Sequence, residues 1–269
     1  MRVVTSVAAG DGFSVEDVRI RAETRAWSDP ESPTGYRLVL VRSGVFRARV
    51  GGRVILADPA VAYMGGPDEE QSIAHRTDRE DVCTVMVVSA RFMAEMTAEP
   101  PRNPSLPVPG ESAVALRLLA ARARGRADPF ELTEMTTRVV GGLLDGRGPT
   151  MTARRLTTVA ARRDLVESVR ELLTQAPCTL GLRQIARHVG CSPHHLSRVF
   201  HQETGMTLTR YRNRIRVFSA LNAIEAGEKD LAGLAADLGF ADHAHLTRTI
   251  RRECGHSPTE LRALFAVRN

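Results

Sequence analysis

The stretch "LRQIARHVGCSPHHLSRVFHQETGMTLTRYR", residues 182–212, returns later in the chain as "LAGLAADLGFADHAHLTRTIRRECGHSPTELR", residues 231–262. The second copy has one inserted residue, and ten positions are identical between the copies. These identical pairs are Leu182/Leu231, Ala186/Ala235, Gly190/Gly239, His194/His243, Leu196/Leu246, Arg198/Arg248, Glu203/Glu253, Gly205/Gly255, Thr209/Thr259 and Arg212/Arg262. Self-similarity of this kind marks a structural unit used twice.

Each copy has the parts of a helix-turn-helix. These parts are a short helix, a glycine that can take positive φ at the turn, and a capped second helix. In the first copy Ser192 is the expected N-cap and Pro193 takes the first helical position, whereas Asp242 is the expected cap of the second copy. We expect the two units at about residues 182–205 and 231–254, joined by a longer helix near 208–226.

The second helix of each unit has a polar face opposite its apolar face. In the first unit the polar face carries His194, Ser197, Arg198 and His201, at i, i+3, i+4 and i+7. In the second unit it carries Ala244, Thr247, Arg248 and Arg251, flanked by His243 and His245. Such a face fits a DNA major groove, where Arg contacts guanine and Ser, Thr or His meet base edges or phosphates.

The run "IARHVGCSPHHLSRVFHQETGMTLTRYRNRIRVFSALNAI", followed by "LAADLGFADHAHLTRTIRRECGHSPTELR", resembles the AraC/XylS family of bacterial transcription regulators. The resemblance covers roughly residues 165–265. It departs from the family at Ile250 and Leu261, where aromatic residues are usual, although both positions stay apolar. The resemblance implies two helix-turn-helix units joined by a long helix, with bases contacted by the exposed residues of the two recognition helices. Here these residues are His194, Ser197, Arg198, His201, His243, Ala244, His245 and Arg248.

The resemblance also implies a docking geometry. Two recognition helices in one polypeptide would enter successive major grooves about 34 Å apart. The side chains expected to contact phosphates are Ser192, Thr247, Arg210, Arg212, Arg214, Arg216, Arg251 and Arg252. Six to eight such contacts would give a log-log salt slope of roughly −5 to −7.

The charge distribution agrees with an anionic partner for the second half of the chain. Residues 1–150 hold 19 basic and 20 acidic residues, whereas residues 151–269 hold 18 and 11. A basic segment favours a partner such as double-stranded DNA. The chain has no run of eighteen apolar residues, and its N-terminus becomes acidic before a signal-peptide core could form. We therefore expect a cytoplasmic, nucleoid-associated protein that does not enter a membrane.

The N-terminal half has the pattern of a β-rich domain. Between about residues 15 and 90, short apolar runs are bounded by turns at Gly51-Gly52, Asp58-Pro59 and Gly65-Gly66-Pro67. Six to eight strands without intervening helices predict a small barrel or sandwich. Helical spacing follows at 113–124 and 130–144, after a proline-rich stretch.

The expected fold is α+β with two domains. Residues 1–98 would form a cupin-like β-barrel, 99–150 a connection with appended helices that could serve dimerisation, and 151–269 the all-α DNA-binding domain, after a linker at 145–152. The resemblance implies that the barrel senses a small-molecule effector and supports homodimerisation. It also implies RNA polymerase as a partner if the protein is an activator.

The effector site has few candidates in the sequence. Trp27, Tyr36, Tyr63 and Met64 could line a small-molecule pocket, although aromatic residues such as these more often belong to a hydrophobic core. A metal-dependent cupin enzyme is disfavoured because His75 is the only histidine before residue 188. We expect no enzyme activity and no cofactor.

The four cysteines, Cys83, Cys178, Cys191 and Cys254, contain no C-x-x-C pair and are expected to be reduced. A thiol sensor at Cys83 is one alternative, and a DNA-repair methyl acceptor is a more distant one. A metal site in the histidine-rich stretch at 190–205 is disfavoured, because His194 and His195 diverge by about 100° on a helix and His194 and His201 lie about 10 Å apart along it.

Overall fold

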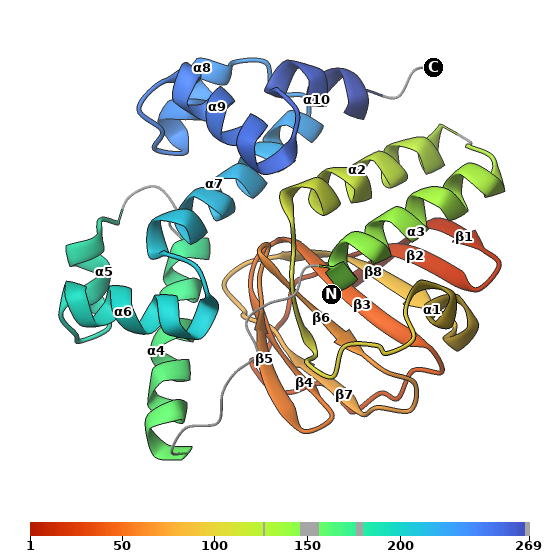
Figure 1. The fold of residues 1–269 in the computed structure, drawn as a ribbon, viewed down its shortest axis with the longest axis horizontal. Helices are drawn as coiled ribbons and strands as arrows, with labels where there is room; N and C mark the ends of the chain where they lie inside the picture. Colours follow the sequence, from red (N-terminus) through yellow and green to blue (C-terminus); the bar gives the residue numbers. More distant parts are fainter. Residues whose placement is uncertain (126, 146–155, 176–179, 267–269) are drawn as a thin grey trace.

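The computed structural model describes residues 1–125, 127–145, 156–175 and 180–266. Its N-terminal half is rich in strands and its C-terminal half is helical, as expected (Figure 1). The strands are β1 (Arg2–Gly10), β2 (Phe13–Ile20), β3 (Tyr36–Ser43), β4 (Phe46–Val50), β5 (Arg53–Ala57), β6 (Val61–Gly65), β7 (Gln71–Ala74), β8 (Asp81–Val88) and β9 (Ser105–Pro107). The helices are α1 (Ala90–Met96), α2 (Gly110–Arg124), α3 (Pro129–Asp145), α4 (Leu156–Gln175), α5 (Leu182–His188), α6 (Pro193–Thr204), α7 (Leu208–Glu225), α8 (Leu231–Asp237), α9 (His243–Cys254) and α10 (Pro258–Phe265). Nearly all of the expected linker at 145–152 lies outside the described residues.

A six-stranded antiparallel sheet, in the order β1-β2-β8-β3-β6-β9, is the middle layer of the N-terminal half. Its central strands β3 and β6 are mostly buried on both faces, whereas the edge strand β1 is mostly exposed. In β3, Leu38 and Leu40 belong to the core shared with the helices, whereas Val39 and Val41 belong to the core shared with a second sheet. The continuous apolar run in "YRLVLVRS" is therefore the pattern of a strand covered on both sides.

The strands do not close into the cupin-like barrel that the sequence led us to expect. In the described part of the chain they form two separate sheets, the second being three-stranded in the order β5-β4-β7. Helices α2 and α3 cover one face of the large sheet, and the small sheet lies against the other (Figure 1). Because stacking buries both faces, the sheet does not need to curl on itself, and β1 and β9 remain as its edges.

The turns follow the expected residues. Gly51 and Gly52 join β4 to β5 and both have positive φ, +53° and +77°, which a two-residue hairpin turn of this hand requires. Asp58 and Val61 form an isolated bridge where β5 passes to β6. The proline-rich stretch after residue 99 contributes more than a connection, because its strand β9 pairs with β6.

Helix α7 lies at the centre of the helical half. It contacts α2, α4, α6, α9, α10 and β3, so neighbours surround most of it. This position explains why its buried residues are spread around the helix and do not form one stripe. Among the described helices, none is long and apolar enough to cross a membrane.

Candidate nucleic-acid interface

Helices α5 and α6 form the first helix-turn-helix unit. At the turn, Gly190 has φ +69°, and no heavy atom lies within 4 Å of the position a Cβ would take. Ser192 caps α6 as predicted, since its Oγ accepts a hydrogen bond from the His195 amide at 3.1 Å and Pro193 follows as the first helical residue. Helix α6 ends at Gly205, which has φ +70°. Local chemistry thus determines both ends of the recognition helix.

Helices α8 and α9 form the second unit in the same way. Gly239 has φ +67°, and Asp242 Oδ1 accepts a hydrogen bond from the His245 amide at 2.6 Å. The extra residue of the second copy lies in the turn before the cap, because α6 and α9 both have 12 residues and begin directly after Ser192 and Asp242. His194 is therefore structurally equivalent to Ala244, although the sequence alignment pairs it with His243.

The apolar face of each recognition helix is buried in an equivalent way. Leu196 and Leu246 are both 0% exposed, as are Phe200 and its counterpart Ile250. The Phe200 ring packs edge-on against Tyr211, with 5.3 Å between ring centroids. The departure from the family pattern at Ile250 leaves the position filled.

The polar faces point away from the domain. His194, Arg198 and His201 are exposed on α6, and Ser197 between them is half-buried. On α9 the equivalent residues follow the same order, with Ala244, Arg248 and Arg251 exposed and Thr247 half-buried. The structure therefore brings the predicted residues together as two matching stripes, one on each recognition helix.

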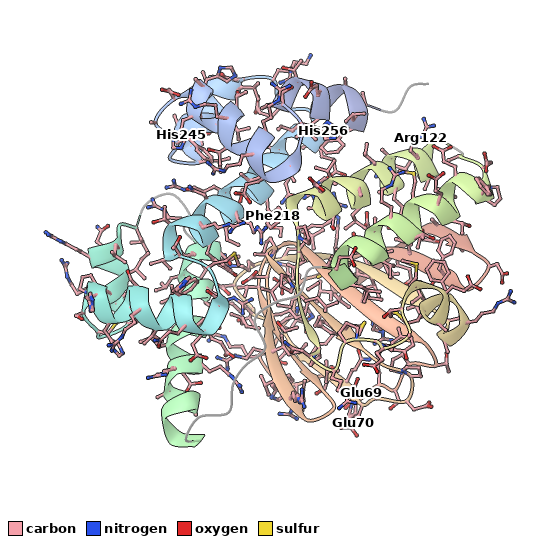
Figure 2. The ribbon with its side chains drawn as sticks, in the orientation of Figure 1. Glu69, Glu70, Arg122, Phe218, His245 and His256 are labelled. Atoms are coloured by element: carbon pink, nitrogen blue, oxygen red, sulfur yellow. The ribbon has the colours of Figure 1, made fainter. Side chains whose placement is uncertain are left out.

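The two histidines that share a position in the units, His195 and His245, face partly inward. His245 lies in the second unit, where Figure 2 labels it. Its Nδ1 accepts a hydrogen bond from the Ala241 amide at 3.3 Å, and its ring lies edge-on to Phe240 at 5.3 Å. His195 Nδ1 lies 3.5 Å from Arg198 Nη2. His243 is exposed, and its Nε2 lies 3.3 Å from Thr247 Oγ1 on the outer face. Of the predicted histidines, His245 has the least freedom to meet a ligand.

The predicted phosphate-binding residues divide into surface and interior groups. Ser192, Arg210, Arg251 and Arg252 are exposed, and Arg212 and Thr247 are half-buried. Arg216 is buried and Arg214 is half-buried with most of its side chain covered, contrary to expectation. The Arg214 side chain is 12% exposed and its Nε lies 3.6 Å from Glu253, while Arg216 is 6% exposed and lies 5.7 Å over the Phe240 ring. Burial lowers the pKa of Arg214. Neither guanidinium is placed to meet an external phosphate.

The two helix-turn-helix units are similar to those of known proteins. A helix-turn-helix domain family matches residues 185–263. The chain is 37% identical over 78 residues to the HTH-type transcriptional activator RhaS of Escherichia fergusonii, covering 29% of this chain and 28% of RhaS. It is 28% identical over 88 residues to the arabinose operon regulatory protein of Escherichia coli K12, covering 33% of this chain and 30% of that protein. Residues 185–263 form an AraC-type helix-turn-helix domain.

This result confirms the resemblance noted in the sequence. The matches span about a third or less of these curated relatives, so they concern the AraC-type domain alone. Over the whole chain, the crystal structure of ToxT from Vibrio cholerae O395 aligns at 12% identity, with a TM-score of 0.38 and coverage of 95% of this chain and 99% of ToxT.

A buried polar triad ties the AraC-type domain and the preceding α4 to the strand-rich half. Asp58, between β5 and β6, is 0% exposed, and its Oδ2 accepts hydrogen bonds from Arg170 Nε at 2.8 Å and from the Tyr211 hydroxyl. Arg170 Nη2 also donates to the Leu56 carbonyl at 2.8 Å. Burial raises the pKa of Tyr211, which keeps its hydroxyl protonated as a donor. No sequence motif pointed to these residues.

A second polar cluster holds the other end of α7. Glu225 accepts from Arg42 of β3 and lies 3.2 Å from Arg117 Nε of α2. Asn222 Nδ2 donates to the Arg42 carbonyl at 2.7 Å, and the Asn222 side chain in turn accepts from Arg117. Burial lowers the pKa of Arg117 to about 10. Helix α7, which joins the two units, is therefore fastened to the strand-rich half at both ends.

The start of α2 touches the AraC-type domain directly. A Cβ on Gly110 would lie 2.0 Å from the backbone oxygen of Glu253, at the end of α9. Beside this contact, α2, α7 and α9 enclose a cleft of about 640 Å³, lined in part by Glu111, Arg210 and Arg252. Two of the surface arginines thus lie next to the N-terminal half.

The four effector candidates do not share one site. Tyr63 and Met64 are adjacent on β6 and enter the two different cores on opposite faces of the large sheet. Tyr36 packs at the helix-covered side, and Trp27 lies under the Arg49 guanidinium at 4.2 Å. These four residues are absent from the lining of three cavities that lie against α7.

One of the four has an unusual environment. Tyr63 is 0% exposed, and its hydroxyl has no hydrogen-bond partner among the described residues. The buried amide of Gln71 is likewise unpartnered. Burial raises the pKa of Tyr63, so its hydroxyl is protonated and available as a donor. Buried polar groups nearly always have a partner, and these two residues are among several buried side chains with a polar atom that lacks a hydrogen-bond partner among the described residues.

The described cysteines are poorly placed for thiol chemistry. Cys83 and Cys254 are buried, and burial raises the pKa of both, that of Cys254 to about 12. Cys191 is half-buried and its pKa is also raised by burial. Cys178 lies outside the described residues. Within the described residues no three His, Cys, Asp or Glu side chains gather as a metal site would require.

Proposed function

We propose that the chain is a sequence-specific transcription regulator that binds double-stranded DNA. The observation that carries this proposal is the pair of matching stripes, because two capped recognition helices present equivalent polar residues outward. Surface Arg, Ser and Thr at these positions have the chemistry for base edges and phosphates. The match of residues 185–263 to the AraC-type family supports the same function.

The proposed base contacts are those of the two stripes. His194, Ser197, Arg198 and His201 would enter one major groove, and Ala244 and Arg248, flanked by His243 and His245, the next one. Ser192, Thr247, Arg210, Arg212, Arg251 and Arg252 would contact phosphates. The interior positions of Arg214 and Arg216 remove them from this set.

Footprinting of the full chain on its own upstream region and on promoter fragments, over a salt series, tests the proposal. The four arginines of the phosphate set predict a log-log salt slope no steeper than roughly −4, and the protected site should cover about two helical turns. Absence of any salt-sensitive protected site would overturn the DNA-binding function.

Substitution at the two stripes tests base contact. Arg198→Gln and Arg248→Gln should each lower discrimination against a mismatched base by about 1–3 kcal/mol. Arg138→Gln is the matched control, because Arg138 is exposed on α3 and pairs there with Glu134. Equal loss on specific and unrelated DNA would show that these arginines contact phosphates only.

We further propose that the strand-rich half binds a small-molecule effector and supports a homodimer. We also propose that the protein is an activator that contacts RNA polymerase. The unpartnered Tyr63 hydroxyl and Gln71 amide support a polar ligand or an ordered water between the sheets. The contacts at both ends of α7 would couple that site to the recognition helices. A thermal-shift screen of small polar compounds tests the effector, and a hit that binds Tyr63→Phe equally well would exclude this position.

A thiol sensor and a methyl acceptor find no support in the described cysteines. Reactive cysteines need a lowered thiol pKa and access to solvent. Cys83 has the opposite properties, since it is 2% exposed and its pKa is raised well above the usual value by burial.

A further inference from the structure

The two helix-turn-helix units are alike in backbone but differ in charge. Residues 182–212 contain five arginines and one glutamate, a net charge of +4 with histidines neutral. Residues 231–262 contain four arginines and four acidic residues, a net charge of 0. The two copies share their shape, and only the first carries a net positive charge.

Two surface arginines of the first unit have no carboxylate beside them. Arg198 and Arg210 are exposed, and within the described residues neither forms an ion pair with a carboxylate. Glu203 is the one acidic residue of this unit, and it lies on the inward-facing side of α6. The guanidinium groups are therefore available to DNA without breaking an ion pair, that of Arg198 to a base edge and that of Arg210 to a phosphate.

In the second unit Arg248, the equivalent of Arg198, likewise forms no ion pair with a carboxylate among the described residues, but the charges near the end of α9 are compensated. Glu260 occupies the position of Arg210, the third residue of the helix that follows the recognition helix. Its Oε1 lies 3.5 Å from Arg251 Nη2, and its Oε2 accepts from the Ser257 amide at 2.6 Å. Hydrogen bonding to Ser257 lowers the pKa of Glu260, which is therefore ionised at neutral pH.

A second pair completes this compensation. Glu253 lies 3.6 Å from Arg252 and 3.6 Å from Arg214. The surface arginines at the end of α9 thus each have a carboxylate beside them. A phosphate approaching Arg251 or Arg252 would meet the negative charge of these neighbours as well.

We propose that the two units have different roles on DNA: the first supplies most of the electrostatic affinity, and Glu260 and Glu253 restrict the second to sequence discrimination. This proposal rests on the DNA-binding function. Affinity without sequence preference comes from phosphate neutralisation and counterion release, whereas base contacts determine specificity. A unit with no net charge adds little to non-specific binding and can engage only where its base contacts are satisfied.

Salt-dependent binding of the full chain to an unrelated duplex and to its footprinted site tests the proposal. Arg210→Gln should weaken both complexes roughly eightfold at 0.1 M salt and make the log-log slope shallower by about 0.9, because one phosphate is no longer neutralised. Glu260→Gln keeps the side-chain cap of α10 and releases Arg251, so it should strengthen binding to the unrelated duplex several-fold and steepen the slope.

The ion pair in the second unit gives a double-mutant cycle. Arg251→Gln should cost less affinity in the wild-type chain than in the Glu260→Gln chain, because Glu260 already engages Arg251. Glu134→Gln on α3 removes an exposed surface carboxylate that pairs with Arg138 outside the recognition helices, and it is the matched control. Circular dichroism and the Tm of each variant show that folding is retained.

Two results would distinguish a failure of the proposed division of roles from a failure of the proposed DNA-binding function. If Arg251→Gln weakens binding as much as Arg210→Gln, and Glu260→Gln changes nothing, the division of roles is wrong while DNA binding stands. If the wild-type chain shows no salt-sensitive binding to any duplex, the proposed function itself fails.

Discussion

Asp58 accepts hydrogen bonds from residues that lie 112 and 153 positions further along the chain, Arg170 and Tyr211. Its other oxygen, Oδ1, accepts from the Ala60 amide at 2.8 Å. Each oxygen of this fully buried carboxylate therefore has a partner, which is the condition under which a buried charge is tolerated.

Asp58→Asn should strongly destabilise the chain. The substitution leaves the buried Arg170 guanidinium without its counter-charge, and breaking such a pair costs about 3–5 kcal/mol. Urea unfolding followed by circular dichroism measures the loss. Tyr211→Phe removes only the hydroxyl and should lose less, about 1.5–3 kcal/mol for a hydrogen bond to a charged group. Equal and small losses for both variants would mean that the triad is not a closed ion pair in solution.

The Cys254 thiol should make stability depend on alkaline pH. Its pKa is raised by burial to about 12 in the folded state, from a usual value of 9.0. The folded state therefore holds the thiol proton more tightly, so this stabilisation is complete below pH 9 and is lost as pH rises towards 12. Urea unfolding at about pH 8 and about pH 10.5, on either side of the usual thiol pKa, should show a smaller decline for Cys254→Ala than for the wild type. Alkylation of Cys254 at neutral pH before that of the half-buried Cys191 would contradict its burial.

At the scale of elements, the turn of each unit depends on one glycine conformation. Gly190 has φ +69° and open space around its missing side chain, so Gly190→Ala tests the backbone alone. A left-handed conformation costs an alanine about 1–2 kcal/mol, and the loss should appear as a lower Tm. Gly181→Ala is the matched control, because Gly181 has φ −79°. A larger loss at Gly181 than at Gly190 would refute this explanation.

The elements also show what the sequence could predict. The units, their caps and their glycines were predictable because each depends on residues a few positions apart. The polar stripes followed from the same helical spacing. Arg214 and Arg216 were predicted to contact phosphates because a charged residue on a helix was assumed to face water. Their helix α7 is surrounded by neighbours, a fact that no local pattern encodes. The prediction of a closed barrel was wrong for a similar reason, because strand patterns do not reveal which element covers the second face of a sheet.

At the scale of the whole molecule, α2 and the AraC-type domain meet without room for a side chain. Gly110→Ala would place a Cβ 2.0 Å from the Glu253 backbone oxygen, and neither group is a flexible side-chain end. The contact between α2 and α9 must therefore open, which should increase hydrogen exchange in both helices. Gly66→Ala is the control, because its Cβ would meet only ordinary contacts at 3.6 Å. Unchanged exchange in α2 and α9 would show that the two halves are held apart in solution.

The residues that link the strand-rich half to the helical half could not be predicted from the sequence, for a physical reason. Asp58, Arg117 and Glu225 each have ordinary neighbours in the chain, and their roles arise only when distant segments pack. Arg117 is only 3% exposed, and this burial indicates a structural role that the neighbouring residues in α2 do not predict. The two helix-turn-helix units could be predicted further than the rest of the fold, because each unit depends on residues close in the chain and the elements that support it do not.

The attachment of α7 at both ends to the strand-rich half has a consequence for the DNA site that the proposed function requires. An 18-residue helix is about 27 Å long and cannot lengthen. One base pair inserted between the two half-sites rotates the second by about 34–36°, since a turn holds 10–10.5 base pairs. Insertion of five base pairs should therefore abolish binding by one chain. Insertion of ten base pairs restores the angle between the two half-sites but not the distance between them, so binding should fail as well. Two helix-turn-helix units joined by a flexible tether would instead bind again after an insertion of ten base pairs.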